Sequence, residues 1–209
     1  MKLGSSDISK VYLGSTEVTK AYLGSVVVHE GVNPLPSGYK KMKYIQNASN
    51  AYINTGIKPN QNSVIKMKWY SQSHSYGTSM FASDYVYARY TNAQTTLSLR
   101  FGSVTTTSTV AYKATHTIEM SNAGIIIDGN QIIVPSAADF SSSKNLLLGG
   151  WWSGSSVKSY GPIRYYEVEV DDYLLIPCQR ESDNKCGVYI TGLEEFKSSD
   201  GSAEFTGVA

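Results

Sequence analysis

The stretch Val64-Ile65-Lys66-Met67-Lys68-Trp69-Tyr70 alternates apolar and polar side chains along almost its whole length. Successive side chains of a β-strand point to opposite faces of a sheet, so Ile65, Met67 and Trp69 share one face and the intervening residues share the other. The apolar face is expected to be buried. Trp69 is therefore predicted to belong to the core, although a tryptophan also suits a ligand platform.

Short segments of the same kind follow one another along the chain, and turn residues separate nearly all of them. No stretch shows the helical period of apolar residues over three turns. Asp128-Gly129 between two apolar segments is a strong signal for a two-residue hairpin. Many short strands at close spacing predict an all-β, antiparallel two-sheet sandwich or jelly roll. The predicted strands are 42–46, 52–56, 64–70, 78–83, 85–90, 96–101, 105–112, 116–120, 124–128, 131–134, 145–148, 163–170 and 173–176.

The strand that begins at Tyr85 carries the second candidate binding surface. Val86 and Ala88 are expected on its core side, and Tyr85, Tyr87 and Arg89 in a row on the opposite side. Glycan binding needs a flat aromatic face and a few fixed polar groups, which such a row supplies. An ordinary tyrosine-rich sheet surface is the other interpretation.

The first candidate surface is the pair Trp151-Trp152, in the glycine- and serine-rich segment 149–156. Two adjacent indoles in a flexible loop cannot both point into one strand face, so at least one is expected to be accessible. Exposed large aromatic side chains usually mark a contact surface. Both a glycan platform and a hydrophobic plug over the sandwich edge stay open. Tyr76 and Tyr160 are further candidates.

A ten-residue phrase is written almost three times at the start of the chain, with Leu-Gly-Ser at 3–5, 13–15 and 23–25. Its strand-turn rhythm predicts a three-stranded β-meander over residues 1–33. A ribbon of this size rarely folds without neighbours. We therefore expect a docking or oligomerisation ribbon, with packing onto its own main domain as the alternative. The proline-rich segment 34–38 is the expected linker, and 39–209 the main domain.

The composition bounds the function. The 209 residues carry a net charge of +1, and only 17% are charged, so no electrostatic attraction to nucleic acid or anionic membrane is expected. No apolar run suits a membrane span, and the N-terminus lacks the apolar core of a secretory signal. Tyrosine, serine, threonine and glycine are typical of an extracellular-type surface. This combination fits a virion component made in the host cytoplasm, or a chain whose signal was removed.

Cys178 and Cys186 bracket a seven-residue polar segment. They could face each other across a hairpin and form a disulfide, or remain two free thiols in a protein assembled in the cytoplasm. The second interpretation is favoured. No further Cys or His stands near these two cysteines at the spacing that a zinc site needs.

A catalytic hypothesis rests on Glu167 and Glu169, which alternate on one strand with Val168 and Val170 turned to the core. A retaining glycosidase holds two carboxyl groups about 5 Å apart, and same-face neighbours on a strand can approach that separation. Acidic residues on an exposed strand face are, however, common without catalysis. The hydrolase interpretation is therefore kept as an alternative.

Other chemistry has less support in the sequence. The three histidines, His29, His74 and His116, stand in unrelated contexts, and no Gly-x-Ser-x-Gly elbow appears. His116 opens a strand and is expected at the surface or in a hairpin. A calcium ion could bind near Asp183 and Asn184 or near Asp171 and Asp172, but turn formation is the favoured role of these residues, so no cofactor is expected.

Ten segments occur in a characteristic order along the chain, and they include Ala51-Tyr52-Ile53-Asn54-Thr55-Gly56-Ile57-Lys58-Pro59 and Leu175-Ile176-Pro177-Cys178-Gln179-Arg180. Together these segments resemble the laminin-G-like jelly rolls of the concanavalin A-like lectin/glucanase superfamily, in the form found in phage and prophage tail proteins. The N-terminal ribbon resembles the Leu-Gly-Ser repeats that precede such domains. Two departures are visible: Ile190 stands where the family often has Asp, and the glucanase phrase Glu-x-Asp-x-x-Glu is absent, since 169 is Glu and 172 is Asp. The matching segments are 38–45, 51–59, 116–119, 127–129, 146–150, 161–163, 175–180, 182–184, 187–189 and 201–207.

This resemblance implies a non-catalytic phage tail or tail-like receptor-binding protein or adhesin. Its jelly-roll head would meet a cell-surface polysaccharide, and residues 1–33 would tether it to other tail proteins or to sister chains, as a homotrimer in the virion. A structural decoration protein without a ligand and a glucanase-like hydrolase are the alternatives. Neither a nucleic-acid partner nor membrane insertion is expected.

Overall fold

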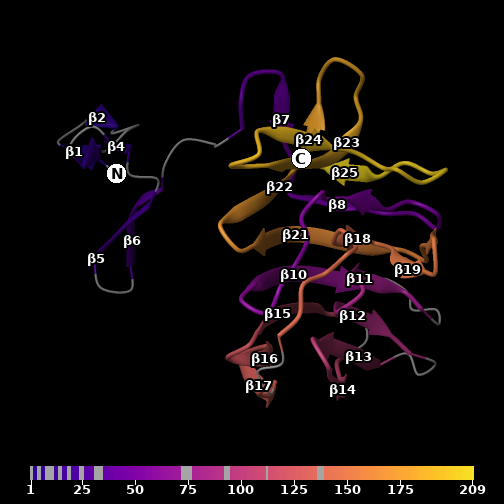
Figure 1. The fold of residues 1–209 in the computed structure, drawn as a ribbon. Coiled ribbons are helices and arrows are strands. Elements are labelled where there is room, and N and C mark those ends of the chain that lie inside the picture. The colour runs from indigo at the N-terminus through magenta and orange to yellow at the C-terminus, as the bar shows by residue number, and fades with distance from the viewer. Residues whose placement is uncertain are drawn as a thin grey trace. The chain divides into compact units, whose positions relative to one another are not determined.

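The computed structural model describes residues 35–71, 77–91, 95–111, 113–135 and 139–209, together with the backbone of six short strands between residues 2 and 30. The chain divides into two compact units, Met1–Pro36 and Ser37–Ala209. Every regular element in the described residues is a β-strand (Figure 1). None of the described segments forms a helix of the length and apolar character needed to cross a membrane.

The described strands of the N-terminal unit pair within each copy of the repeat. The three antiparallel pairs replace the single three-stranded meander that the repeat predicts, because each strand meets its partner across only two intervening residues. Residues between the pairs lie outside the described part. The strands are β1 (Lys2–Leu3) with β2 (Ser6–Asp7), β3 (Tyr12–Leu13) with β4 (Thr16–Glu17), and β5 (Lys20–Leu23) with β6 (Val26–Glu30).

The larger sheet of the second unit contains eleven antiparallel strands among the described residues. Its main path runs β17-β16-β15-β10-β21-β22-β23-β24, while β7 pairs with β22, and β8 pairs with β21 and β25. Its strands are β7 (Tyr39–Lys41), β8 (Tyr44–Gln46), β10 (Ile65–Ser71), β15 (Thr115–Ser121), β16 (Gly124–Ile127), β17 (Asn130–Ile133), β21 (Ile163–Val170), β22 (Tyr173–Arg180), β23 (Cys186–Ile190), β24 (Glu195–Lys197) and β25 (Thr206–Val208).

The second sheet has six described strands in the order β14-β13-β12-β11-β18-β9. A separate hairpin, β19 (Trp151–Ser153) with β20 (Ser156–Lys158), contacts β11. Figure 1 shows the edge strands β14 and β17 at the same end of the two sheets. The strands of this second sheet are β9 (Ile53–Asn54), β11 (Ser79–Ala82), β12 (Val86–Tyr90), β13 (Thr96–Phe101), β14 (Val104–Thr109) and β18 (Leu147–Leu148).

The two sheets pack face to face around one apolar core, which confirms the all-β sandwich predicted from the sequence. Trp69 is fully buried, as predicted, and its Nε1 donates to the Tyr90 hydroxyl across the sheets at 3.3 Å. Tyr165 likewise spans the core and donates to the Met80 carbonyl at 3.2 Å. Both of these buried aromatic polar groups thus find a partner on the facing sheet.

Strand β21 changes its inward face part-way along. The register between β10 and β21 shifts at Lys68/Trp69, so the inward residues of β21 are Ile163 and Tyr165 before the shift and Val168 and Val170 after it. An extra residue in one strand reverses the alternation, which the period-2 pattern of the sequence does not reveal. The predicted inward position of Val168 and Val170 is confirmed.

Several elements differ from the sequence expectations, since β7, β19, β20, β23, β24 and β25 lie outside the predicted strands. The segment around Trp151 and Trp152 is a hairpin with Gly154 at φ +65°, not a flexible loop. Strand β22 continues through Pro177 to Arg180, beyond the predicted end at 176. Pro177 lacks an N–H, but on that side β22 pairs with β21 through Leu175 and resumes pairing, with β7, at Cys178. No ladder hydrogen bond is therefore lost at the proline.

The disulfide considered for the two cysteines is not formed, and both are free and buried. Cys178 lies opposite Gly187, whereas Cys186 lies opposite Gln179. Neighbouring positions on a strand alternate in direction, so the two thiols leave opposite faces of the β22–β23 pair. A hairpin spacing alone does not show this register.

Candidate functional site

The outer face of the six-stranded sheet gathers an aromatic and basic cluster. Along β12, Val86 and Ala88 are buried in the core, as predicted, while Tyr87 and Arg89 point the other way and are half-buried. The guanidinium carbon of Arg89 lies 4.7 Å from the centroid of the Tyr87 ring. This distance places the cation over the ring in a cation–π contact.

The β19–β20 hairpin adds Trp151 to this cluster. The guanidinium carbon of Arg89 is 5.3 Å from the Trp151 ring, and Nζ of Lys158, the cross-strand partner of Trp151, is 5.9 Å from it. The structure thus brings together members of two candidate surfaces that stand far apart in the sequence. We call Tyr87, Arg89 and Trp151 the arginine–aromatic cluster.

Gly77 packs beside the cluster and allows a close approach. A Cβ at this position, where φ is +83°, would lie 3.3 Å from the Tyr160 ring and 3.5 Å from Nε1 of Trp151. Tyr160 and Trp151 therefore both lie beside Gly77, and the side chain of Tyr160 is exposed. Tyr76 lies outside the described residues.

The donors of the cluster lack acceptors. Nε1 of Trp151 is buried and makes no hydrogen bond to a described residue. The side chain of Arg89 forms no hydrogen bond or ion pair with any described residue. The undescribed stretches after residue 37 contain neither Asp nor Glu, so no carboxylate from them can pair with Arg89. Unpaired buried donors are rare and usually mark strain, a function or a missing partner.

Trp152 belongs to a different environment. Trp151 and Trp152 are successive residues of β19, so their side chains point in opposite directions. Nε1 of Trp152 donates to the Asn145 carbonyl at 3.0 Å, and Nζ of Lys144 lies 4.9 Å from the Trp152 ring. The two indoles therefore separate, one toward the arginine–aromatic cluster and the other toward the backbone before β18.

Tyr85 also stands apart from the cluster. It precedes β12, its ring stacks on Phe140 with centroids 5.5 Å apart, and the Arg100 guanidinium lies 5.3 Å from it. The predicted row of three side chains is thus divided between two groups on the same sheet.

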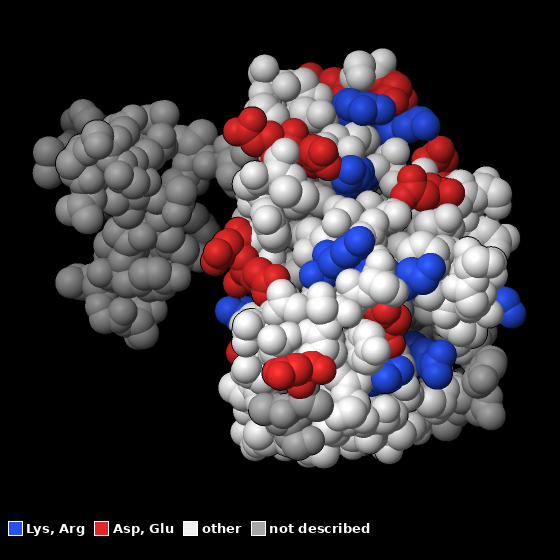
Figure 2. Space-filling view, viewed as in Figure 1, with Lys and Arg blue, Asp and Glu red and all other residues white. Residues whose placement is uncertain are grey.

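The two glutamates of the hydrolase hypothesis face lysines. Glu167 is directly opposite Lys68 on the neighbouring strand, and Glu169 is opposite Lys66, whose Nζ lies 3.3 Å from Oε1 of Glu169. They line a groove of about 360 Å³ on the outer face of the larger sheet. Cross-strand pairs of opposite charge of this kind are an ordinary way to stabilise a sheet surface. Figure 2 shows acidic and basic residues interspersed over the face in view.

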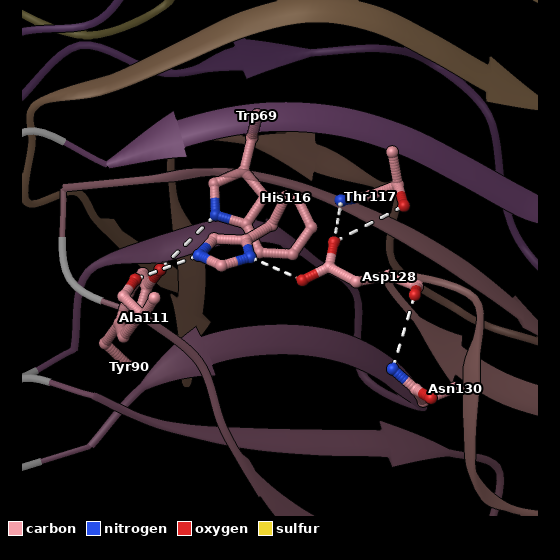
Figure 3. A network of polar contacts seen from close by, with 7 residues as sticks. All are labelled: Trp69, Tyr90, Ala111, His116, Thr117, Asp128 and Asn130. Atoms are coloured by element: carbon pink, nitrogen blue, oxygen red, sulfur yellow. Dashed lines mark hydrogen bonds and ion pairs between the residues drawn. The ribbon is translucent and has the colours of Figure 1, made fainter.

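A second polar network surrounds His116 and is drawn in Figure 3. His116 is 5% exposed, contrary to its expected surface position. Its Nδ1 lies 2.6 Å from Oδ2 of Asp128, and its Nε2 lies 2.9 Å from the Ala111 carbonyl oxygen. Both ring nitrogens therefore lie within hydrogen-bond distance of an oxygen atom. The His116 ring also packs against Trp69, with centroids 5.4 Å apart.

Asp128 links this network to the predicted hairpin. Asp128 and Gly129 occupy the two turn positions with φ of +51° and +78°, as a type I′ turn requires, which confirms the predicted hairpin. Oδ1 of Asp128 also accepts the Thr117 N–H at 2.8 Å. No nucleophilic side chain contacts His116 in the described residues, so the network positions the turn against the core.

The carboxylates considered for calcium are bonded within the protein. Asp171 accepts from the Ser63 hydroxyl and the Val64 N–H, and Arg180 donates to Asp183. The hydrogen bond from Arg180 lowers the pKa of Asp183 to about 2. Among the described residues, no group of three or more His, Cys, Asp and Glu side chains could hold a metal ion.

Comparisons with known proteins add no family to this description. No protein-family model matches the chain, and no curated protein is significantly similar to it in sequence.

Proposed function

We propose that this chain is a non-catalytic attachment protein of a phage tail or tail-like particle, and that its sandwich recognises a cell-surface glycan. The single observation that carries the proposal is the convergence of Tyr87, Arg89 and Trp151 on one outer sheet face. Sugar rings stack on aromatic faces, and polar groups beside them fix the orientation of the sugar.

The type of fold supports this proposal. Two antiparallel sheets with a shared core fit the concanavalin A-like jelly roll that the sequence resembles. Residues 1–33 would then join the chain to other tail proteins or to two sister chains. Fold alone does not assign a ligand, so the proposal depends on the arginine–aromatic cluster.

The experiment is a glycan array probed with the full chain and with the double variant Tyr87→Ala/Trp151→Ala. We expect the native chain to bind a defined set of polysaccharides and the double variant to lose that binding while it keeps its far-UV circular dichroism. A matched control is Tyr44→Ala/Tyr166→Ala, which removes an aromatic pair, 5.4 Å between centroids, at another place on the surface. An array without any signal would instead favour a structural decoration protein.

A further inference from the structure

All four arginines of this chain lie over aromatic rings, and comparing them separates one from the rest. The guanidinium of Arg100 lies over Tyr85, that of Arg164 over Tyr44 and Tyr70, and that of Arg180 over Phe196. Arg89 lies over Tyr87 and Trp151. Ring contacts alone therefore do not distinguish a binding site from a packed surface.

The hydrogen bonds make the distinction. Arg100 donates to the Gly102 carbonyl at 2.8 Å, Arg164 to Oε1 of Gln46 at 2.8 Å, and Arg180 to both carboxylate oxygens of Asp183. The guanidinium of Arg89 donates to no described residue. It is thus the one guanidinium of the four without an acceptor among the described residues.

The geometry points to an anion-binding site at Arg89, and we propose that the recognised glycan is acidic, with a carboxylate or a sulfate ester. This inference rests on the proposed glycan-binding function. The guanidinium carbon lies over both rings, and none of the guanidinium N–H groups donates a hydrogen bond to a described residue. A planar fork of donors matches the two oxygens of an acid group in a bidentate hydrogen bond.

The neighbouring groups favour an anion in the same way. Lys158 lies beside the Trp151 ring and adds a second positive charge, and Nε1 of Trp151 is a further donor without an acceptor. No described carboxylate forms an ion pair with Arg89 or Lys158. A neutral sugar would stack on the rings but leave the guanidinium unpaired, so an acidic sugar gains an interaction that a neutral one lacks.

The experiment compares polymers that differ only in charge. Isothermal titration calorimetry would measure the affinity of the full chain for polygalacturonate and for its carboxyl-reduced form. The same measurement would be made with dextran sulfate and with dextran. We expect at least tenfold tighter binding of one anionic polymer than of its neutral counterpart, since hydrogen bonds between charged partners are the strong ones. Tighter binding of polygalacturonate would indicate that the site recognises a carboxylate, and tighter binding of dextran sulfate would indicate a sulfate ester.

Two matched variants test the role of Arg89. Arg89→Gln should reduce the affinity for the anionic polymer at least tenfold and leave that for the neutral polymer unchanged. Arg164→Gln removes the same charge from a guanidinium that also lies over two rings but already has an acceptor, and it should change the affinity less than twofold. An equal loss in both variants would show attraction to net charge only and would overturn the assignment of Arg89.

The failures of the two proposals are distinguishable. If charged and neutral polymers bound equally well, the acidic-glycan inference would be overturned and glycan binding would stand. The same conclusion would follow if every glycan bound on the array were neutral. The absence of binding to every glycan would overturn both.

Discussion

The guanidinium carbon of Arg89 lies 5.3 Å from the Trp151 ring, although the two residues come from separate sheets and distant parts of the sequence. The contact exists because the β19–β20 hairpin folds onto β11, the neighbour of β12. It brings one tryptophan of the Trp151–Trp152 pair together with two residues of the β12 row, Tyr87 and Arg89.

The two tryptophans are expected to respond differently to mutation. Trp151→Ala should abolish glycan binding without unfolding the domain, because Trp151 lies in the arginine–aromatic cluster and is only half-buried. Trp152→Phe should retain binding but lower the free energy of unfolding by about 1 kcal/mol, since it removes the hydrogen bond to Asn145. Calorimetric titration and urea unfolding measure the two effects, and normal binding by Trp151→Ala would contradict the assignment.

Glycoside hydrolysis is tested at Glu167 and Glu169. We expect no release of reducing sugar from polysaccharides by the native chain, and no difference for Glu167→Gln/Glu169→Gln, because both carboxylates lie opposite lysines. A reducing-sugar assay on a panel of glucans measures this. Turnover that disappears in the double variant would instead establish the hydrolase hypothesis.

The His116–Asp128 pair should stabilise the fold. Asp128→Asn removes the charged partner of a buried imidazole and is expected to lower the free energy of unfolding by about 2 kcal/mol. Urea unfolding of the native chain and of the variant measures the loss of stability. Asp139→Asn is a suitable control for the loss of a carboxylate, and an equal effect of both variants would contradict this role.

The buried thiol of Cys178 makes the fold sensitive to alkali. Burial raises the pKa of Cys178 to about 12, from the ordinary 9.0. At moderately high pH only the unfolded chain then releases the thiol proton, which favours unfolding. The contribution of the protonated thiol to the free energy of unfolding is therefore complete below pH 9 and is lost as the pH rises toward 12. Burial raises the pKa of Tyr90 to about 12 as well, with the same sign.

Urea unfolding between pH 8 and pH 11 checks this prediction. The native chain should lose stability steadily above pH 9, and Cys178→Ala should show a shallower decline. At pH 8 a thiol reagent such as dithionitrobenzoate should react with neither cysteine until the chain is unfolded, since both are buried. Rapid reaction of the folded chain would contradict the buried, unbridged placement.

Removal of residues 1–33 tests the docking role of the N-terminal ribbon. The remaining chain retains both sheets and the core and should fold as a monomer. Light scattering measures its mass beside that of the full chain. If the truncated chain kept the oligomeric mass of the full chain, assembly would depend on the sandwich itself.

Local patterns in the sequence predict many of the strands and which of their faces are apolar, but they miss β7, β19, β20, β23, β24 and β25. The alternation in 64–70 predicts Trp69 in the core, and Asp128-Gly129 predicts a hairpin, because both signals act between near neighbours. The burial of His116 does not follow from such patterns, since its two acceptors, at Asp128 and Ala111, lie on other segments.

Pairings between distant strands follow only from the packed fold. The shift at Lys68/Trp69, the opposite directions of the two cysteines and the meeting of Arg89 with Trp151 all depend on which strands lie side by side. Side-chain alternation fixes the two faces of one strand, but register and neighbours are set by how the whole core packs. The candidate site is therefore a product of packing, assembled from residues whose local patterns are independent.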